Sequence, residues 1–394
     1  MSTPQTVAAS FAATPGTLKL GRSTRRAGGK LRIAVVAPPW FAVPPPGYGG
    51  IERVVAYLVE GLCAAGHEVT LFASGGSRTS ARLVSTYPEP PSKQLGDAAV
   101  EMAHTVHAFR MARRFDIIHD HTFLGLASGV LCSTPVVHTI HGLVTPELRR
   151  LYQAVSPPIN LVTISEHQRS TLPTGVAART IHNAIPLGEV PFGAVAKDYL
   201  LFVGRMNPDK GVLDAIEIAR RSNHPLVIVA KVNEPPEQRY FDEQVKPALE
   251  GLDAEVFLQP PEDVKWRLYR EAKATLFPIR WPEPFGLVMI ESMASGTPVI
   301  AFRDGSVPEV IRDGETGYIC DSVAGAVEAV GRVHRLSRAA CRAHVAACFS
   351  AEAAVARHED LYRAILEDGT TSRENPASDA DALMPAGEGR GSAG

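Results

Sequence analysis

Two series of short apolar segments alternate with helical patterns along this chain of 394 residues. Each segment is a continuous run rich in β-branched residues, which is typical of a strand buried on both faces. The runs lie at residues 31–37, 68–73, 116–119, 135–139 and 161–164, and then at 199–203, 226–230, 255–258, 274–277 and 298–301. Alternation of strands and helices favours parallel sheets covered by helices on both sides. The sequence therefore predicts an α/β protein built from two domains.

The break between the two series falls near residues 191–197. We predict one Rossmann-like domain at residues 31–195, a second at 196–348, and a helix at 349–367 that returns to the first domain. Ligands of open parallel sheets bind at the carboxyl ends of the strands. We therefore expect the functional site in a cleft between the two domains.

The two ends of the chain lack the periodic apolar pattern of the interior. Residues 1–30 contain no Asp or Glu, and residues 368–394 are polar and rich in Gly and Ala. We predict that both are disordered tails. For residues 1–30 a transit peptide remains an alternative, since an acid-free leader that carries arginine can mimic one.

Composition excludes several classes of protein. The formal net charge of -2 argues against a nucleic-acid partner, and no apolar run approaches the roughly 20 residues that cross a bilayer. The five cysteines form no C-x-x-C pair, which argues against a disulfide framework and a cysteine zinc site. This cysteine pattern favours a cytoplasmic protein.

Glycines before the first helix indicate an anion site. A dinucleotide-binding domain needs G-x-G-x-x-G directly after its first strand, whereas Gly49-Gly50 come more than ten residues after Ala37. This spacing argues against a dehydrogenase. Gly49-Gly50 stand where the next helix begins, and free N–H groups and the helix dipole favour a phosphate there. A plain turn is the alternative interpretation.

The second domain carries charged residues in matching loops. Arg205 and Lys210 follow its first strand, and a guanidinium with an ammonium suits a pyrophosphate. A further helix is expected near Gly286, with its N–H groups directed at the same anion. Glu291 lies among apolar neighbours on that helix, so its carboxylate needs a hydroxyl or cation partner. A structural ion pair is the alternative role for Glu291.

Together these motifs resemble the GT-B retaining glycosyltransferases of family 4, the glycosyl transferases group 1. The resemblance covers about residues 31–366 and is most specific in the second half. It rests on Gly49-Gly50, G-R-x4-K-G at 204–211, E-x7-E from Glu283 to Glu291, and the segments 292–301, 304–311 and 313–317. It implies the GT-B fold, in which two Rossmann-like domains face each other across a cleft.

The resemblance also implies roles for individual residues. It assigns His141 and Glu283 to catalysis, with His141 bonding the donor sugar and His138 in a supporting place. It assigns the donor's ribose to Glu291, and Phe285 and Gly286 to the donor sugar. The donor diphosphate is expected to contact Gly49, Gly50, Arg205, Lys210, Leu287 and Val288. Base contacts are expected from the loops at residues 231–233 and 259–264.

The implied reaction moves a sugar from a nucleoside-diphosphate sugar to an acceptor, with retention of configuration. The acceptor is a glycolipid, a polysaccharide or a small-molecule glycoside. No cofactor or metal is expected, because the only D-x-D, Asp379-Ala380-Asp381, lies in the predicted tail. A double displacement through Glu283 is the mechanistic alternative.

Three other interpretations remain open. His119, His121, His138 and His141 could form the site of a metal-dependent hydrolase. The same fold could also serve a non-catalytic protein that binds carbohydrate or nucleotide. Peripheral contact with the inner face of a membrane is a further possibility, through the arginines at positions 110, 113, 114, 149 and 150.

Overall fold

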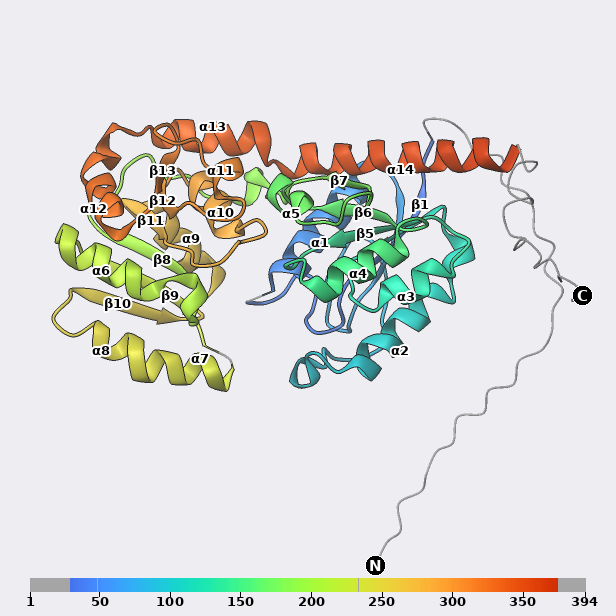
Figure 1. The fold of residues 1–394 in the computed structure, drawn as a ribbon, viewed down its shortest axis with the longest axis horizontal. Coiled ribbons are helices and arrows are strands. Elements are labelled where there is room, and N and C mark those ends of the chain that lie inside the picture. The colour runs from blue at the N-terminus through green and yellow to red at the C-terminus, as the bar shows by residue number, and fades with distance from the viewer. Residues whose placement is uncertain (1–28, 48, 233, 375–394) are drawn as a thin grey trace, which may run out of the picture. The chain divides into compact units, whose positions relative to one another are not determined.

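The structure, a computed structural model, describes residues 29–47, 49–232 and 234–374 (Figure 1). Side chains are described as far as residue 368. The predicted tail at residues 1–30 therefore lies almost wholly outside the described residues, as does the D-x-D at 379–381. From Leu31 onward the chain belongs to one unit.

Within the described residues, the first sheet has seven parallel strands in the order β3-β2-β1-β4-β5-β6-β7. Their bounds are β1 Arg32–Val36, β2 Glu68–Phe72, β3 Arg82–Val84, β4 Ile117–Asp120, β5 Val136–Ile140, β6 Asn160–Thr163 and β7 Ala178–Thr180. Strand β1 pairs Val36 with Phe72 on one side and with Asp120 on the other.

Helices cover both faces of this sheet, and successive side chains of a strand point to opposite faces. Ile33 and Val35 pack with α1 (Gly50–Ala64) and α14 (Ala351–Glu374). Ala34 and Val36 face the opposite core, which includes α2 (Ala98–Phe109), α3 (Gly125–Val130) and α4 (Pro146–Val155). The short helix α5 (Glu166–Ser170) follows β6.

The second sheet repeats this plan, again within the described residues, with six parallel strands in the order β10-β9-β8-β11-β12-β13. Its strands are β8 Leu200–Arg205, β9 Leu226–Lys231, β10 Ala254–Leu258, β11 Ala274–Phe277, β12 Val299–Phe302 and β13 Gly317–Cys320. One face packs on α6 (Val212–Ser222) and α12 (Val323–Arg332). The other face packs on α9 (Glu262–Glu271), α10 (Leu287–Ala294) and α13 (Arg338–Cys348). The remaining helices are α7 Pro235–Tyr240, α8 Lys246–Ala248 and α11 Val307–Val310.

Strand order reverses beside the first strand of each sheet, between β1 and β4 and between β8 and β11. Such a reversal opens a crevice at the carboxyl ends of the strands. The ends of these four strands, and the loops and helix starts that follow them, carry Gly49-Gly50, His121, Gly204–Gly211 and Glu283–Val288. The predicted α/β fold class is therefore confirmed, and the topology brings the predicted motifs to the strand ends.

The last helix differs from the prediction at its end. A helix was expected over residues 349–367, and α14 begins at Ala351 but continues to Glu374. The tail predicted from residue 368 is thus helical as far as residue 374. Extending an existing helix is easy because each added residue gains one hydrogen bond, whereas nucleation is costly. No helix among the described residues has the length and apolar character needed to cross a membrane.

Candidate active site

A cleft of about 660 Å³ lies at the carboxyl ends of the strands, and both sheets contribute to its walls. Nine residues predicted for the site line it: Gly50, His141, Arg205, Lys210, Glu283, Phe285, Gly286, Leu287 and Val288. Gly49 and Glu291 are not among the described residues that line the cleft. The structure thus brings together motifs that are up to 238 positions apart, from Gly50 to Val288.

Lys210 and Glu283 form an ion pair inside the cleft. Lys210 Nζ lies 2.5 Å from Glu283 Oε2, and Trp281 Nε1 donates to the same oxygen at 2.9 Å. The ammonium also lies 4.6 Å from the centre of the Trp281 ring. Glu283 is therefore held by two donors in this structure.

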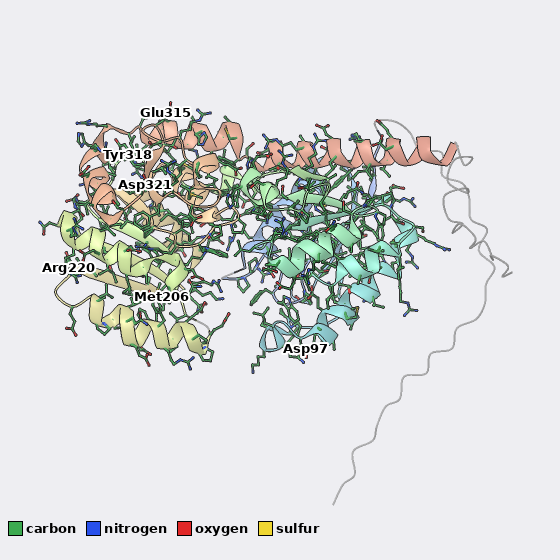
Figure 2. All side chains as sticks on the ribbon, in the orientation of Figure 1. Asp97, Met206, Arg220, Glu315, Tyr318 and Asp321 are labelled. Atoms are coloured by element: carbon green, nitrogen blue, oxygen red, sulfur yellow. The ribbon has the colours of Figure 1, made fainter. Side chains whose placement is uncertain are left out.

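Arg205 ends β8, and its guanidinium lies 3.8 Å from Glu237 at the cleft. The next residue, Met206, is fully buried, which anchors the start of the loop (Figure 2). Lys231 ends β9 and also lines the cleft; burial lowers the pKa of its ammonium. Two loops were predicted to contact the base. Lys231 of the first loop lines the cleft, whereas none of residues 259–264 is among the described residues that line it.

The amino end of α10 opens onto the cleft. Gly286 precedes this helix with φ +78°, and a Cβ there would lie 2.8 Å from Met289 Cε. A glycine is required because both the backbone angle and the space exclude other side chains. Leu287 and Val288 form the first turn, whose N–H groups have no acceptor within a helix. These donors and the helix dipole make the position suitable for a phosphate.

Gly49 lies in the turn that precedes α1, in the first domain. It directly precedes the helix and has a φ of +154°, an angle that residues with side chains rarely adopt. There is also no room for a side chain, since a Cβ would lie 2.8 Å from Pro45 and 2.9 Å from Glu52. Gly50 then begins α1 on the lining of the cleft. The loop therefore matches the predicted turn, and its role toward a phosphate stays a prediction.

Glu291 has the partners that its apolar surroundings require. Lys265 Nζ and Tyr269 Oη each lie 3.0 Å from its carboxylate, one on each oxygen. The predicted need for a cation or hydroxyl partner is thus confirmed. The structure shows the ion pair that sequence analysis kept as the alternative, so the ribose role remains a prediction.

His141 is held from behind by a second histidine. Its Nε2 lies 2.9 Å from Nδ1 of His121, whose other nitrogen has no partner among the described residues. Burial lowers the pKa of His141 to about 3 and that of His121 well below its usual value. Both rings are therefore neutral at pH 7.

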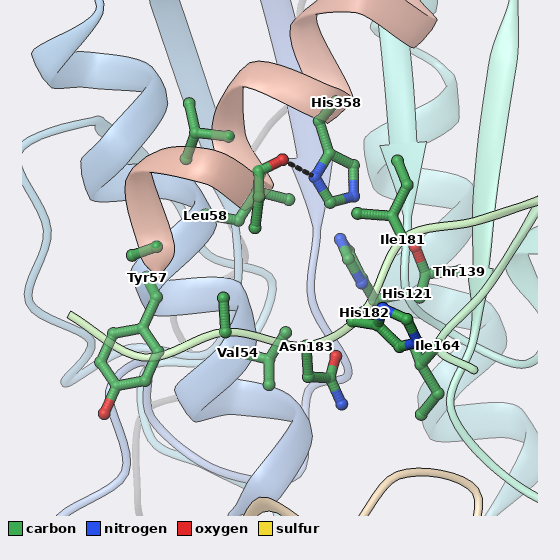
Figure 3. A pocket seen from close by; sticks show the side chains of 14 residues that line it. Val54, Tyr57, Leu58, His121, Thr139, Ile164, Ile181, His182, Asn183 and His358 are labelled. Carbon is green, nitrogen blue, oxygen red and sulfur yellow. Dashed lines mark hydrogen bonds between the residues drawn. The ribbon is translucent and has the colours of Figure 1, made fainter. Parts of the chain in front are cut away.

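A small cavity of about 30 Å³ lies behind this pair. His121, Asn183 and His358 are among its lining residues (Figure 3). His358 Nδ1 donates to the carbonyl of Ala354 at 2.8 Å, so its Nε2 is left as an acceptor. The space suffices for one water molecule.

The predicted four-histidine metal site does not form. His119 Nδ1 and Nε2 lie 2.6 Å from Tyr362 Oη and 2.7 Å from Thr139 Oγ1, so both nitrogens are occupied. His138 Nδ1 bonds Asp120 at 2.8 Å. No group of three or more His, Cys, Asp or Glu in the described part of the chain could hold a metal ion. The hydrolase alternative is therefore not supported.

Several cleft residues were missed by sequence analysis. Trp40, Leu95 and Phe123 line the first-domain side, as does the buried carboxyl of Glu52. Glu52 is an acidic residue in the first turn of a helix, which is a weak signal. Isolated apolar residues in loops give no periodic pattern at all.

Comparison with known proteins agrees with this geometry. A family model described as Glycosyltransferase Family 4 matches residues 48–189, and another described as Glycosyl transferases group 1 matches residues 193–338. A glycogen synthase of Mycobacterium tuberculosis is 28% identical over 77% of this chain and 86% of its own length. A D-inositol 3-phosphate glycosyltransferase of Acidothermus cellulolyticus is 29% identical over 74% and 79%.

Solved structures show the same fold. AviGT4, a glycosyltransferase involved in avilamycin A biosynthesis, superimposes with a TM-score of 0.65 and 25% identity, over 86% of this chain and 98% of its own. A sucrose-phosphate synthase from Thermosynechococcus elongatus gives a TM-score of 0.72 at 20% identity, over 86% and 100%.

Proposed function

Because this chain belongs to the family 4 glycosyltransferases of the GT-B fold, we propose that its donor is a nucleoside-diphosphate sugar. The acceptor hydroxyl takes the sugar with retention of configuration and without a metal ion. One observation carries the proposal: Arg205, Lys210 and the amino end of α10 all line one cleft, with His141 on its first-domain side.

The donor side of the cleft supplies the charge that a departing diphosphate needs. Two cations and the N–H groups of a helix end stabilise developing negative charge without a proton donor. Among solved structures of the same fold, Anabaena HepE was solved with UDP and starch synthase IV of Arabidopsis thaliana with ADP. The GT-B fold is thus compatible with more than one nucleotide base.

Retention follows if the acceptor attacks from the face that the diphosphate leaves. The C1–O bond to the diphosphate breaks, the acceptor oxygen bonds to C1, and its proton passes to the departing phosphate oxygen. A double displacement needs a free carboxylate as nucleophile. Glu283 is the candidate for that role, and its Oε2 is held by Lys210 and Trp281 in this structure.

Nucleotide binding tests the donor assignment. UDP-, GDP-, ADP- and TDP-sugars would be titrated by calorimetry in EDTA. One of them should bind, and Lys210→Ala should weaken it by about 10- to 100-fold, since a hydrogen bond to a charged group contributes roughly 1.5–3 kcal/mol. Lys246→Ala is the matched control, because Lys246, the first residue of α8, pairs with Asp242 and is not among the described residues that line the cleft. Strict dependence of binding and turnover on added Mg²⁺ or Mn²⁺ contradicts the metal-free proposal.

Proton NMR of the first product tests the stereochemistry. An α-linked donor should give an α-glycoside. A β-linked product overturns retention, together with the role proposed for the departing phosphate.

A further inference from the structure

The first-domain side of the cleft carries an apolar wall made of Trp40, Phe41, Leu95, Phe123, Leu143 and Leu148. Leu95 and Phe123 are each 51% exposed, and Trp40 is 8% exposed. Phe41, Leu143 and Leu148 are partly exposed. All six line the cleft that His141 also lines. An exposed apolar patch next to polar groups is typical of a ligand-binding surface.

Hydrogen bonds fix the loops that present this wall. Glu101 Oε1 accepts from the N–H of Phe123 at 2.6 Å and from that of Leu124 at 3.3 Å. Ser92 Oγ donates to the carbonyl of Trp40 at 2.6 Å, which joins the loop before Leu95 to the loop after β1. The exposed side chains are therefore held at the cleft by the fold.

Charge on the cleft is divided between its two sides. The positively charged lining residues are Arg205, Lys210 and Lys231. Arg205 and Lys231 end strands of the second sheet, and Lys210 lies in the turn after β8. Among the described lining residues from Pro38 to Asn183 there is no Lys or Arg, whereas Glu52 and Glu101 are present. A phosphorylated acceptor on this side would find no cation among the described lining residues. The same lack of cations disfavours contact of the wall with an anionic membrane surface.

We propose that the acceptor is an uncharged glycoside with an apolar aglycone, taken from solution. This inference rests on the proposed function and adds the class of acceptor. The aglycone packs on the apolar wall, while a hydroxyl of its sugar lies near His141 and receives the transferred sugar. That hydroxyl oxygen bonds to C1 of the donor sugar, the C1–O bond to the diphosphate breaks, and the proton leaves on the phosphate.

Matched glycosides test the acceptor class. Methyl and octyl glycosides of glucose, galactose and mannose share a sugar and differ in the aglycone. They would be compared below the micelle concentration, with the nucleotide sugar that calorimetry identifies, by product mass spectrometry and by direct binding. In at least one pair the octyl glycoside should have a KM or Kd at least about tenfold lower, as burial of two methylene groups suffices for that factor. Inositol 3-phosphate should give no product, and anionic phosphatidylglycerol vesicles should not raise the rate.

Variants of the wall provide the structural control. Leu95→Ser and Phe123→Ser should bring the octyl-to-methyl ratio toward one and leave nucleotide affinity unchanged. Leu131→Ser is the matched control, since Leu131 is 88% exposed and is not among the described residues that line the cleft. It should leave the ratio unchanged.

The possible failures are distinguishable. If octyl and methyl glycosides respond equally in every pair, or neither responds, the apolar acceptor is wrong. Preference for inositol 3-phosphate, or stimulation by the vesicles, also overturns it. In each case Lys210-dependent nucleotide binding would leave the proposed function standing, whereas failure of every nucleotide sugar to bind would overturn that function itself.

Discussion

Glu52 shows how one buried carboxyl changes the response of the protein to pH. It lies in the first turn of α1, lines the cleft and is only 4% exposed. Burial disfavours its charged form and raises its pKa to about 7, from 4.5 in an open chain. Between these pH values the folded protein holds a proton that the unfolded chain has released. Stability therefore falls as pH rises through this window.

Glu52→Gln should remove that loss. The wild type should lose on the order of 3 kcal/mol between pH 4.5 and pH 7 through this group alone, and the variant should not. Urea unfolding at pH 5 and pH 8 measures the difference. Glu60→Gln on the same helix is the control, because hydrogen bonds from Ser80 and Thr79 help lower the pKa of Glu60. Its effect on stability lies below about pH 4.5, so this variant should keep the wild-type loss between pH 5 and pH 8. Parallel behaviour of the two variants would contradict the assignment.

The His121–His141 pair fixes which imidazole nitrogen faces the cleft. Both rings are neutral, so one of the two bonded nitrogens donates and the other accepts. The bond between His121 Nδ1 and His141 Nε2 leaves Nδ1 of His141 for a ligand. His121 is thus a positioning residue for His141.

His121→Phe should lower kcat by about 10- to 100-fold and leave nucleotide Kd unchanged, since a small misplacement of an active-site group can cost that much. His121→Asn keeps a polar atom near the place of Nδ1 and should retain most of the activity. If both variants lose activity equally, a merely structural role accounts for His121.

At the scale of elements, α14 is joined to the first sheet through a close contact with α1. Val355, Leu361 and Tyr362 of α14 belong to the core on that face. Gly61 of α1 faces Val355, and a Cβ on Gly61 would lie 2.4 Å from Val355 Cγ2. This contact requires glycine at position 61.

Gly61→Ala should therefore destabilise the protein by roughly 1–3 kcal/mol, although alanine is the better helix former by about 1 kcal/mol. Combining it with Val355→Ala should recover part of the loss, as a double-mutant cycle would show. Gly331→Ala on α12 is the control, because nothing lies within 4 Å of its Cβ position. It should stabilise slightly or be neutral. Additive effects of Gly61→Ala and Val355→Ala would contradict the direct contact.

Sequence analysis located the central strands to within one or two residues, because each is a continuous apolar run. It missed β3, β7 and β13, which are the short edge strands of the two sheets. β3 and β7 consist of three residues each, with arginine among them, so they carry no apolar period. The charged and glycine-rich side of the cleft was predictable from motifs. The apolar wall was not, since only the tertiary fold brings Leu95 and Phe123 to the same cleft.

At the scale of the whole molecule, four histidines from three separate segments of the chain gather at the cleft and behind it. His119, His121 and His141 come from the first sheet, and His358 comes from α14. Burial lowers the pKa of each, to about 3 for His141 and about 4 for His358. Sequence analysis grouped three of them, together with His138, but no motif pointed to His358.

This cluster should make the protein sensitive to acid. Below pH 6.5 these histidines take up protons in the unfolded chain, whereas the folded protein keeps His358 neutral down to about pH 4. The unfolded state then binds more protons, so stability falls with falling pH, by about 1.4 kcal/mol per pH unit for each such histidine. His358→Gln should reduce the slope of unfolding free energy against pH between 6 and 4.5 by about one proton. The exposed His334→Gln should not change it. An unchanged slope in His358→Gln would mean that His358 takes up a proton equally in the folded and unfolded protein, and the buried neutral cluster would then be wrong.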